Sequence, residues 1–272
     1  AHLAPELSQG KAPEPYQSPP DGFSSVIWPW QESELLAHRL AVCCEGLSVA
    51  TRSRWAESLR SWREPWLQVL WVYEVADLCL LGVSPLSPHP HLLIRDASVV
   101  MPAVEWSKWV ASGRPIPLIK QMFQLKCLHM FGGWWADMDY FLLNAKPPAA
   151  SWSTWMLATE CERRAEVTTN MKLGNKVVTI NLGIMWAQRH SPLVQEAEDK
   201  ARALMRQRTQ RKAIALLVQT EFAKTKRAEI MDPIVTSPFP RWNTKWTSKS
   251  PSGHGEILAM SFTCNVWDGC WS

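Results

Sequence analysis

The sequence predicts an α/β fold with a mostly parallel central sheet flanked by helices. Short strand-like runs alternate with longer helix-like runs through much of the chain, which is the order typical of such sheets. The composition is ordinary for a globular protein, with 46% hydrophobic and 20% charged residues, and 272 residues can bury a large core. We therefore expect a flexible lead-in over residues 1–22 and a single domain over residues 23–272.

The expected elements follow the chain in order, and each is marked by the spacing of its apolar residues. Short runs of β-branched and aromatic residues bounded by turn residues indicate strands, whereas apolar residues that recur with the helical period indicate helices. Strands are expected at residues 25–30, 66–74, 92–97, 155–160 and 177–180. Helices are expected at residues 32–47, 52–63, 105–112, 116–131 and 213–218, with another that begins at Ser191-Pro192. Residues 232–255 are rich in Pro, Ser, Thr and Gly, which indicates a loop.

The clearest of these helices, residues 116–131, is followed by a pair of glycines. Pro117 lies near its start and Gly132 just after its end, which are the positions these residues favour. Gly132 and Gly133 have no Cβ, so they tolerate a positive φ and let the backbone approach a ligand or a neighbouring strand. Two tryptophans then lead into the most informative stretch of the sequence.

An Asp-x-Asp motif, Asp137 and Asp139, closes this apolar run. On an extended segment, residues i and i+2 point to the same side, so both carboxylates can face one target. Two adjacent hard oxygen anions suit a divalent cation such as Mn²⁺ or Mg²⁺, and such a cation commonly carries a phosphate group. The apolar residues on both sides argue against a solvated turn. The motif therefore predicts a metal site.

The run of helix, Gly-Gly, aromatic pair and Asp-x-Asp resembles the DXD-motif sugar-binding glycosyltransferases. This GT-A-type family includes mannosyl-, galactosyl- and capsular-polysaccharide transferases and, more distantly, the clostridial glucosylating toxins. Segments on either side are similar to strands of the family and to its C-terminal ending, although only the Gly-Gly/Asp-x-Asp part is specific. These segments are residues 25–30, 66–74, 92–97, 181–187 and 265–271, so the resemblance covers roughly residues 24–271.

The resemblance implies a GT-A-type nucleotide-sugar-binding domain that transfers a hexose from a UDP- or GDP-linked donor to a hydroxyl of a glycan, lipid or protein, with retention of configuration. Asp137 and Asp139 are the catalytic candidates. The implied cofactor is Mn²⁺ or Mg²⁺, with Asp139 as its direct ligand. Asp137 would bridge to ribose or sugar hydroxyls or reach the metal through water, and Asn265 would complete the metal shell.

The same resemblance implies a set of donor-binding residues. They are Trp28, Asp96, Gln121, Gln124, Gly132, Gly133, Asn181 and Trp271. In a eukaryote, the family works in the Golgi or elsewhere in the secretory pathway.

Two positions depart from the family pattern. Where the family has Asp and, three residues later, Arg on the helix before the glycines, this chain has Gln121 and Gln124. Their spacing puts both on one helix face. Their amides can hydrogen-bond sugar hydroxyls but supply no charge. We therefore expect them to face the donor and help set which sugar is accepted, with Lys120 as a candidate for the missing charge.

Two other functions remain open from the sequence. A neutral glutamine pair also fits a catalytically inactive sugar- or nucleotide-binding module. A strand-end Asp-x-Asp also occurs in Mg²⁺-dependent phosphatases and phosphotransferases, in which the first Asp is the nucleophile. In that class, however, the motif lies near the N-terminus, whereas here it lies in mid-chain.

The composition argues against several partners. The net charge of +4 is small and no long basic run with interleaved aromatics occurs, so nucleic acid is not an expected partner. The seven cysteines contain no Cys-x-x-Cys, which argues against zinc. No apolar run is long enough to span a bilayer. Because the sequence begins with Ala, we allow for membrane association through an N-terminal anchor that precedes it.

Tryptophan is unusually common, with 17 residues. Most are expected in the core, because an indole ring buries a large area and needs only one hydrogen-bond partner. A few flank the candidate site and are expected near the ligand. These are Trp28, Trp134, Trp135, Trp267 and Trp271.

Overall fold

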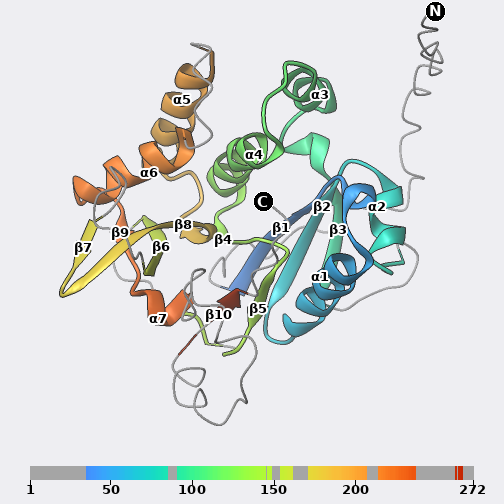
Figure 1. The fold of residues 1–272 in the computed structure, drawn as a ribbon, viewed down its shortest axis with the longest axis horizontal. Helices are drawn as coiled ribbons and strands as arrows, with labels where there is room; N and C mark the ends of the chain where they lie inside the picture. The colour runs from blue at the N-terminus through green and yellow to red at the C-terminus, as the bar shows by residue number, and fades with distance from the viewer. Residues whose placement is uncertain are drawn as a thin grey trace, which may run out of the picture. The chain divides into compact units, whose positions relative to one another are not determined.

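A central sheet of eight strands organises the described part of the chain (Figure 1). The structure is a computed structural model, and it describes residues 35–84, 91–144, 146–148, 154–161, 171–206, 214–236, 261 and 263–265. Trp28, Trp267 and Trp271 lie outside these residues, as do the expected lead-in and the expected strand at residues 25–30.

Four parallel strands form one half of the sheet. Their order across the sheet is β3 (Leu92–Asp96), β2 (Leu67–Val72), β1 (Leu36–Ala41) and β4 (Gly133–Ala136). Because they are parallel, all four end at the same edge, which is where ligands bind in sheets of this kind.

The other half of the sheet continues from β4 and is mostly antiparallel. β8 (Lys176–Ala187) runs antiparallel to β4 and to β6 (Trp155–Cys161), and β9 (Glu229–Ile230) lies parallel to β6. β7 (Met171–Leu173) forms a hairpin with the start of β8. The register of β6 against β8 shifts between Leu157 and Ala158, so β8 bulges around Gly183.

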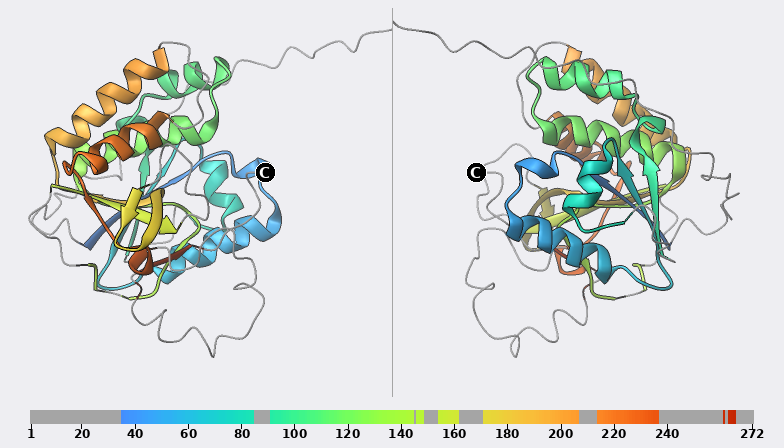
Figure 2. Two further views of the ribbon diagram at one scale, coloured as in Figure 1. Left: turned by 60° about the vertical axis from the view of Figure 1, so that its left-hand side comes forward. Right: turned by 90° about the vertical axis from the view of Figure 1, so that its right-hand side faces the viewer.

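Helices cover both faces of the sheet. Figure 2 shows α1 (Val49–Ser61) and α2 (Val75–Leu80) on one side, and α3 (Ala103–Ala111), α4 (Ile116–Phe131), α5 (Pro192–Arg206) and α6 (Ile214–Lys224) on the other. The smaller elements are η2 (Cys44–Gly46), η3 (Ala97–Val99), α7 (Pro233–Thr236), and the antiparallel pair β5 (Tyr140–Leu142) and β10 (Thr263–Asn265). Within the described residues, no helix is long and apolar enough to cross a membrane.

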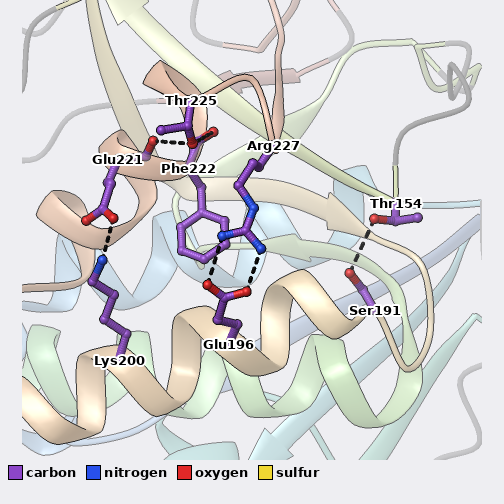
Figure 3. Close-up of polar contacts among 8 residues, drawn as sticks. All are labelled: Thr154, Ser191, Glu196, Lys200, Glu221, Phe222, Thr225 and Arg227. Atoms are coloured by element: carbon purple, nitrogen blue, oxygen red, sulfur yellow. Dashed lines mark hydrogen bonds and ion pairs between the residues drawn. The ribbon is translucent and has the colours of Figure 1, made fainter.

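Ion pairs link α5 to α6 and to the turn that follows α6 (Figure 3). Arg227 Nη1 donates to Glu196 Oε1 at 2.8 Å and Nη2 donates to Glu196 Oε2 at 2.5 Å. The same guanidinium lies 4.7 Å from the centre of the Phe222 ring, and Lys200 pairs with Glu221. Because these charges are exposed, the pairs orient the two helices more than they stabilise them.

The helix expected at residues 32–47 is wrong, because Leu36–Ala41 form strand β1. Leu, Ala and Arg are good helix formers, so the local sequence favours a helix. In the structure all six residues of β1 are buried, because the strand lies between β2 and β4 near the middle of the sheet. Pairing with two neighbouring strands overrides the local propensity.

The rest of the predicted architecture is largely confirmed. The fold is α/β, with a mostly parallel sheet flanked by helices, and α4 has the predicted bounds. The strand expected at residues 177–180 is part of the longer β8, and the helix expected at 213–218 is the first part of α6. The expected loop at 232–255 begins with the short helix α7, whose first residue is Pro233.

Tryptophans build much of the core on one side of the sheet. Trp62 and Trp66 pack edge to face with ring centres 5.0 Å apart, and Trp66 and Trp134 do so at 6.5 Å. All three are buried. The expectation that Trp134 lies near a ligand is therefore wrong. Successive side chains of a strand point to opposite faces, and Trp134 points into this core.

Candidate active site

Asp137 and Asp139 follow β4 at the edge where the four parallel strands end. Together with Met138 they line a cleft of about 240 Å³. The other lining residues come from the end of β1, from η2, from α1 and from the start of α4; they are Leu40, Val42, Cys43, Gly46, Leu47, Trp55, Ile116, Pro117 and Lys120. A larger, more open groove of about 890 Å³ lies beside β9 and contains neither aspartate.

The Asp137 carboxylate is held by one donor on each oxygen. The indole Nε1 of Trp135 donates to Oδ1 at 2.8 Å, and the ammonium of Lys120 donates to Oδ2 at 2.6 Å. The backbone N–H of Asp137 donates to the Gly183 carbonyl at 2.7 Å. The bulge of β8 therefore fixes the backbone of Asp137, while α4 and β4 fix its side chain.

Asp139 is partly buried, and no side chain of the described residues pairs with it. Burial raises the pKa of Asp139 to about 6, and the charge of Asp137 acts in the same direction. Lys120 and Arg39 oppose this rise in pKa. No ion pair among the described residues includes Asp139. A poorly compensated carboxylate of this kind is stabilised by any cation that enters the cleft.

Arg39, in the middle of β1, holds the Asp-x-Asp turn from behind. Its Nη2 donates to the carbonyls of Asp137 at 2.6 Å and Tyr140 at 2.8 Å, and to Ser58 Oγ at 2.6 Å. The side chain is fully buried. Burial lowers the pKa of Arg39 to about 9, while Asp139 and Asp137 act to raise it. Arg39 is not among the site residues predicted from the sequence, because its strand was expected to be a helix.

The Tyr140 carbonyl is the second anchor of the turn. It accepts from Ser58 Oγ at 2.6 Å and from Trp62 Nε1 at 2.9 Å, in addition to Arg39. Three donors on one carbonyl fix the point at which the chain leaves the Asp-x-Asp motif. Ser58 lies on α1 and Trp62 directly follows it, so the end of α1 is part of the frame of the site.

His38 fixes the other end of the motif, at Gly132. Its Nε2 lies 2.9 Å from the Gly132 carbonyl, and its Nδ1 accepts from Trp71 Nε1 at 3.3 Å. Since Nδ1 accepts a hydrogen bond, the ring is neutral with its proton on Nε2. Burial lowers the pKa of His38 to about 4, which keeps it in this form.

Gly132 meets the conditions that require glycine. Its φ is 69° and its ψ is −167°, a region that residues with a side chain rarely enter. A Cβ at Gly132 would also lie 2.6 Å from the backbone nitrogen of Arg189. Gly133 also has a positive φ, of 85°. The predicted glycine turn therefore places β4, and with it the two aspartates, relative to α4.

Gln121 and Gln124 are both buried on α4. Gln124 Nε2 donates to the Leu182 carbonyl at 2.8 Å. The side-chain carbonyl oxygens of both glutamines are buried and accept no hydrogen bond from the described residues. Unmatched buried acceptors are uncommon, and each calls for an explanation.

Three other predicted residues have backbone roles in the structure. Asn181 Oδ1 accepts from the Gly183 N–H at 2.8 Å, within the β8 bulge. Asp96 Oδ1 accepts from the Ser98 N–H at 2.8 Å, which caps η3 at the end of β3. Asn265 on β10 is the register partner of Tyr140, which brings its backbone next to the residue that follows Asp139.

No group of three or more His, Cys, Asp or Glu side chains suited to a metal occurs among the described residues. A metal held by the Asp-x-Asp pair would therefore have two carboxylate ligands, and any further ligand would have to come from outside such a cluster. Hard oxygen donors of this kind suit Mn²⁺ or Mg²⁺ rather than zinc.

Comparison with known proteins gives matches to solved structures alone. No family model matches the chain, and no curated protein matches it. One similar structure is the PaToxG glycosyltransferase, at 9% identity and a TM-score of 0.48, covering 71% of this chain and 69% of that one.

Two further structures are also glycosyltransferases. One is involved in the glycosylation of the major capsid of PBCV-1, at 10% identity and a TM-score of 0.43, with 85% of this chain and 92% of that chain covered. The other is GlyE of Streptococcus pneumoniae TIGR4, at 8% identity and a TM-score of 0.47, with 87% and 55% covered. At this level of similarity, an assignment depends on the residues of the site itself.

Proposed function

We propose that this protein is a metal-dependent glycosyltransferase that moves a sugar from a UDP- or GDP-linked donor to a hydroxyl of a glycan, lipid or protein. The observation that carries the proposal is the cleft at the edge of the parallel strands, lined by both Asp137 and Asp139. A nucleotide sugar brings a diphosphate, and a bridging cation would stabilise a diphosphate bound next to two carboxylates.

Asp139 is the proposed direct ligand of Mn²⁺ or Mg²⁺. Its carboxylate is partly buried and has no ion-pair partner among the described residues, so binding a cation removes an unfavourable charge. Asp137 would act through water or through ribose and sugar hydroxyls, since both of its oxygens already accept hydrogen bonds. Asn265 is the proposed third ligand. The bound cation would neutralise the diphosphate as it becomes the leaving group.

The protein's own residues would orient the donor sugar. Neither Gln121 nor Gln124 lines the cleft, so we propose that the donor sugar extends beyond it to their unmatched carbonyl oxygens, which can accept hydrogen bonds from its hydroxyls. Gly132 and Gly133 would let the backbone approach the donor. Asp96 and Asn181 would shape the donor site through the backbone N–H groups they hold. Trp28 and Trp271 remain predictions.

The family resemblance favours retention of the anomeric configuration. The described residues that line the cleft include no carboxylate apart from Asp137 and Asp139. Among the described residues, the cleft therefore offers no third carboxylate that could act as the nucleophile of a retaining mechanism. NMR of the anomeric proton of the product decides between retention and inversion.

A second candidate is a sugar- or nucleotide-binding module without turnover. The ion pair between Lys120 and Asp137 favours it, because the lysine already compensates one of the two carboxylates. A phosphatase in which Asp137 is the nucleophile fits the structure less well. Both oxygens of that carboxylate accept hydrogen bonds, which lowers their nucleophilicity.

The test is a thermal-shift screen of UDP- and GDP-sugars with and without Mn²⁺, followed by NMR of each stabilising donor. We expect a metal-dependent shift with at least one donor, and then transfer to an added acceptor or slow hydrolysis of the sugar. A shift without turnover would support the binding module. Release of phosphate from a phosphate monoester would support the phosphatase, and no response to any donor would contradict the proposal.

A further inference from the structure

Lys120 is the one cationic side chain among the described residues that line the cleft. It lies near the start of α4, one turn before Gln124, so the two residues share a helix face. Its Nζ is 2.6 Å from Asp137 Oδ2, and the two side chains are 20% and 19% exposed. The ammonium is therefore both anchored and accessible from the cleft.

The second cation nearby cannot take this place. Arg39 is fully buried, and its Nη2 is used by two backbone carbonyls and by Ser58. Its charge acts on the aspartates through the protein, but Nε and Nη2 donate to the backbone, and Nη1 is buried without a hydrogen-bond partner among the described residues. Lys120 has three N–H donors, of which Asp137 accepts one.

We propose that Lys120 is a diphosphate-binding residue of this cleft, held at its wall by Asp137. The inference rests on the proposed function, and it adds a second cation to the leaving-group site. An ammonium that faces the cleft can donate to a phosphate oxygen while it remains paired with Asp137. Nucleoside diphosphates would then keep measurable affinity without a divalent metal, and this affinity would depend on Lys120.

A purely structural role for Lys120 makes a different prediction. If the lysine only orders Asp137, its removal would weaken the metal-dependent part of binding and leave binding in a chelator unchanged. If it contacts the diphosphate, its removal would weaken binding in the chelator. The effect would also be larger for a nucleoside diphosphate than for the corresponding monophosphate.

The experiment is calorimetric titration of UDP, GDP and the corresponding monophosphates, each in Mn²⁺ and in a chelator. The variants are Lys120→Met, Lys120→Gln and Lys120→Arg, so the comparison does not depend on one variant folding well. Lys126→Met is the matched control, because it changes a lysine of the same helix that does not line the cleft.

In the chelator, we expect Lys120→Met and Lys120→Gln to lose about tenfold or more in diphosphate affinity, the scale of one charge-assisted hydrogen bond. Monophosphate affinity should change less, Lys120→Arg should recover most of the loss, and Lys126→Met should match the wild type. Wild-type binding in Mn²⁺ with no change in any Lys120 variant would overturn this inference and leave the proposed function intact. No diphosphate binding by the wild type in either buffer would overturn both.

Discussion

The Arg39 guanidinium donates to the Asp137 carbonyl at 2.6 Å and so connects the middle of β1 to the candidate metal site. The same group donates to the Tyr140 carbonyl at 2.8 Å, so one side chain spans the whole turn. Burial of this charge is costly, as the lowering of the pKa of Arg39 to about 9 shows. Its other contacts are with Ser58, which supports the same turn, with the Ala136 carbonyl at 3.4 Å, and with the Trp62 ring, whose centre lies 5.6 Å from the guanidinium carbon.

We therefore expect Arg39→Met to loosen the turn more than it destabilises the fold. The buried charge disappears together with its hydrogen bonds, which offsets part of the loss in the free energy of unfolding, but the Asp137 carbonyl is left without this donor. Amide exchange in residues 137–142 should speed up by about tenfold or more, which corresponds to the loss of roughly one hydrogen bond to a charged group. Hydrogen exchange with mass spectrometry measures this. Arg206→Met, at an exposed site, is the control, and equal exchange in both variants would contradict the role given to Arg39.

The turn at Gly132 should be more sensitive to substitution than another glycine with a positive φ. Gly132→Ala places a side chain in a disfavoured backbone region, and its Cβ would lie 2.6 Å from the backbone nitrogen of Arg189. Gly174→Ala has a φ of 58° and nothing within 4 Å of the new Cβ, so it carries only the conformational cost. We expect a loss of about 1 kcal/mol for Gly174→Ala and a clearly larger loss for Gly132→Ala in urea unfolding. Equal losses would show that Arg189 moves away at little cost.

Stability should depend on pH through His38. Its folded-state pKa of about 4 lies below the value of 6.5 expected in the unfolded chain. Between these values the unfolded state binds more protons, so the folded state loses stability as the pH falls from 6.5 to 4. A shift of this size corresponds to about 3 kcal/mol.

The contribution of His38 is best measured as a difference between wild type and His38→Gln across this pH range. The raised pKa of Asp139 acts in the opposite direction, since its folded state binds more protons, but it does so in both proteins. We expect the stability difference to shrink as the pH falls from 6.5 to 4. A difference that is independent of pH would show that His38 is not buried in its neutral form. His129→Gln serves as the control on a partly buried histidine.

Gln121 offers a substitution that separates binding from stability. Its buried carbonyl oxygen accepts no hydrogen bond from the described residues. Gln121→Leu therefore replaces an unsatisfied polar side chain with an apolar one of similar volume. We expect the free energy of unfolding to stay the same or rise by about 1 kcal/mol. Affinity for the accepted nucleotide sugar should fall by about tenfold, the scale of one hydrogen bond. Unchanged affinity would place Gln121 outside the donor site, and Gln195→Leu on α5 is the matched control.

The sequence predicts the contiguous parts of the site better than the distant residues that hold them in place. Helix α4, the glycine turn and the Asp-x-Asp motif are contiguous, so periodicity and glycine chemistry are sufficient to place them. Arg39 and His38 act on this segment from a strand almost a hundred residues earlier. That strand was expected to be a helix, because a short buried strand with two polar residues has no clear alternation. The adjacent polar residues His38 and Arg39 within an apolar run were the one feature of the sequence that could have indicated their role.

Lys120 shows a similar limit. Its position beside Gln121 was visible in the sequence, but its ion pair with Asp137 depends on how α4 packs against β4. The bulge of β8, which supplies the carbonyls of Gly183 and Leu182, depends on a register shift against β6. Long-range register of this kind follows from tertiary packing and is not encoded in a local pattern.

The central claim is that Asp139 binds the metal that brings the nucleotide sugar into the cleft. Calorimetric titration of the best donor from the screen, with Mn²⁺ and in a chelator, tests it on wild type, Asp139→Asn and the exposed control Asp199→Asn. We expect Mn²⁺ to strengthen donor binding in the wild type and in Asp199→Asn, and to have no effect in Asp139→Asn. Equal enhancement by Mn²⁺ in Asp139→Asn and the wild type would contradict the claim.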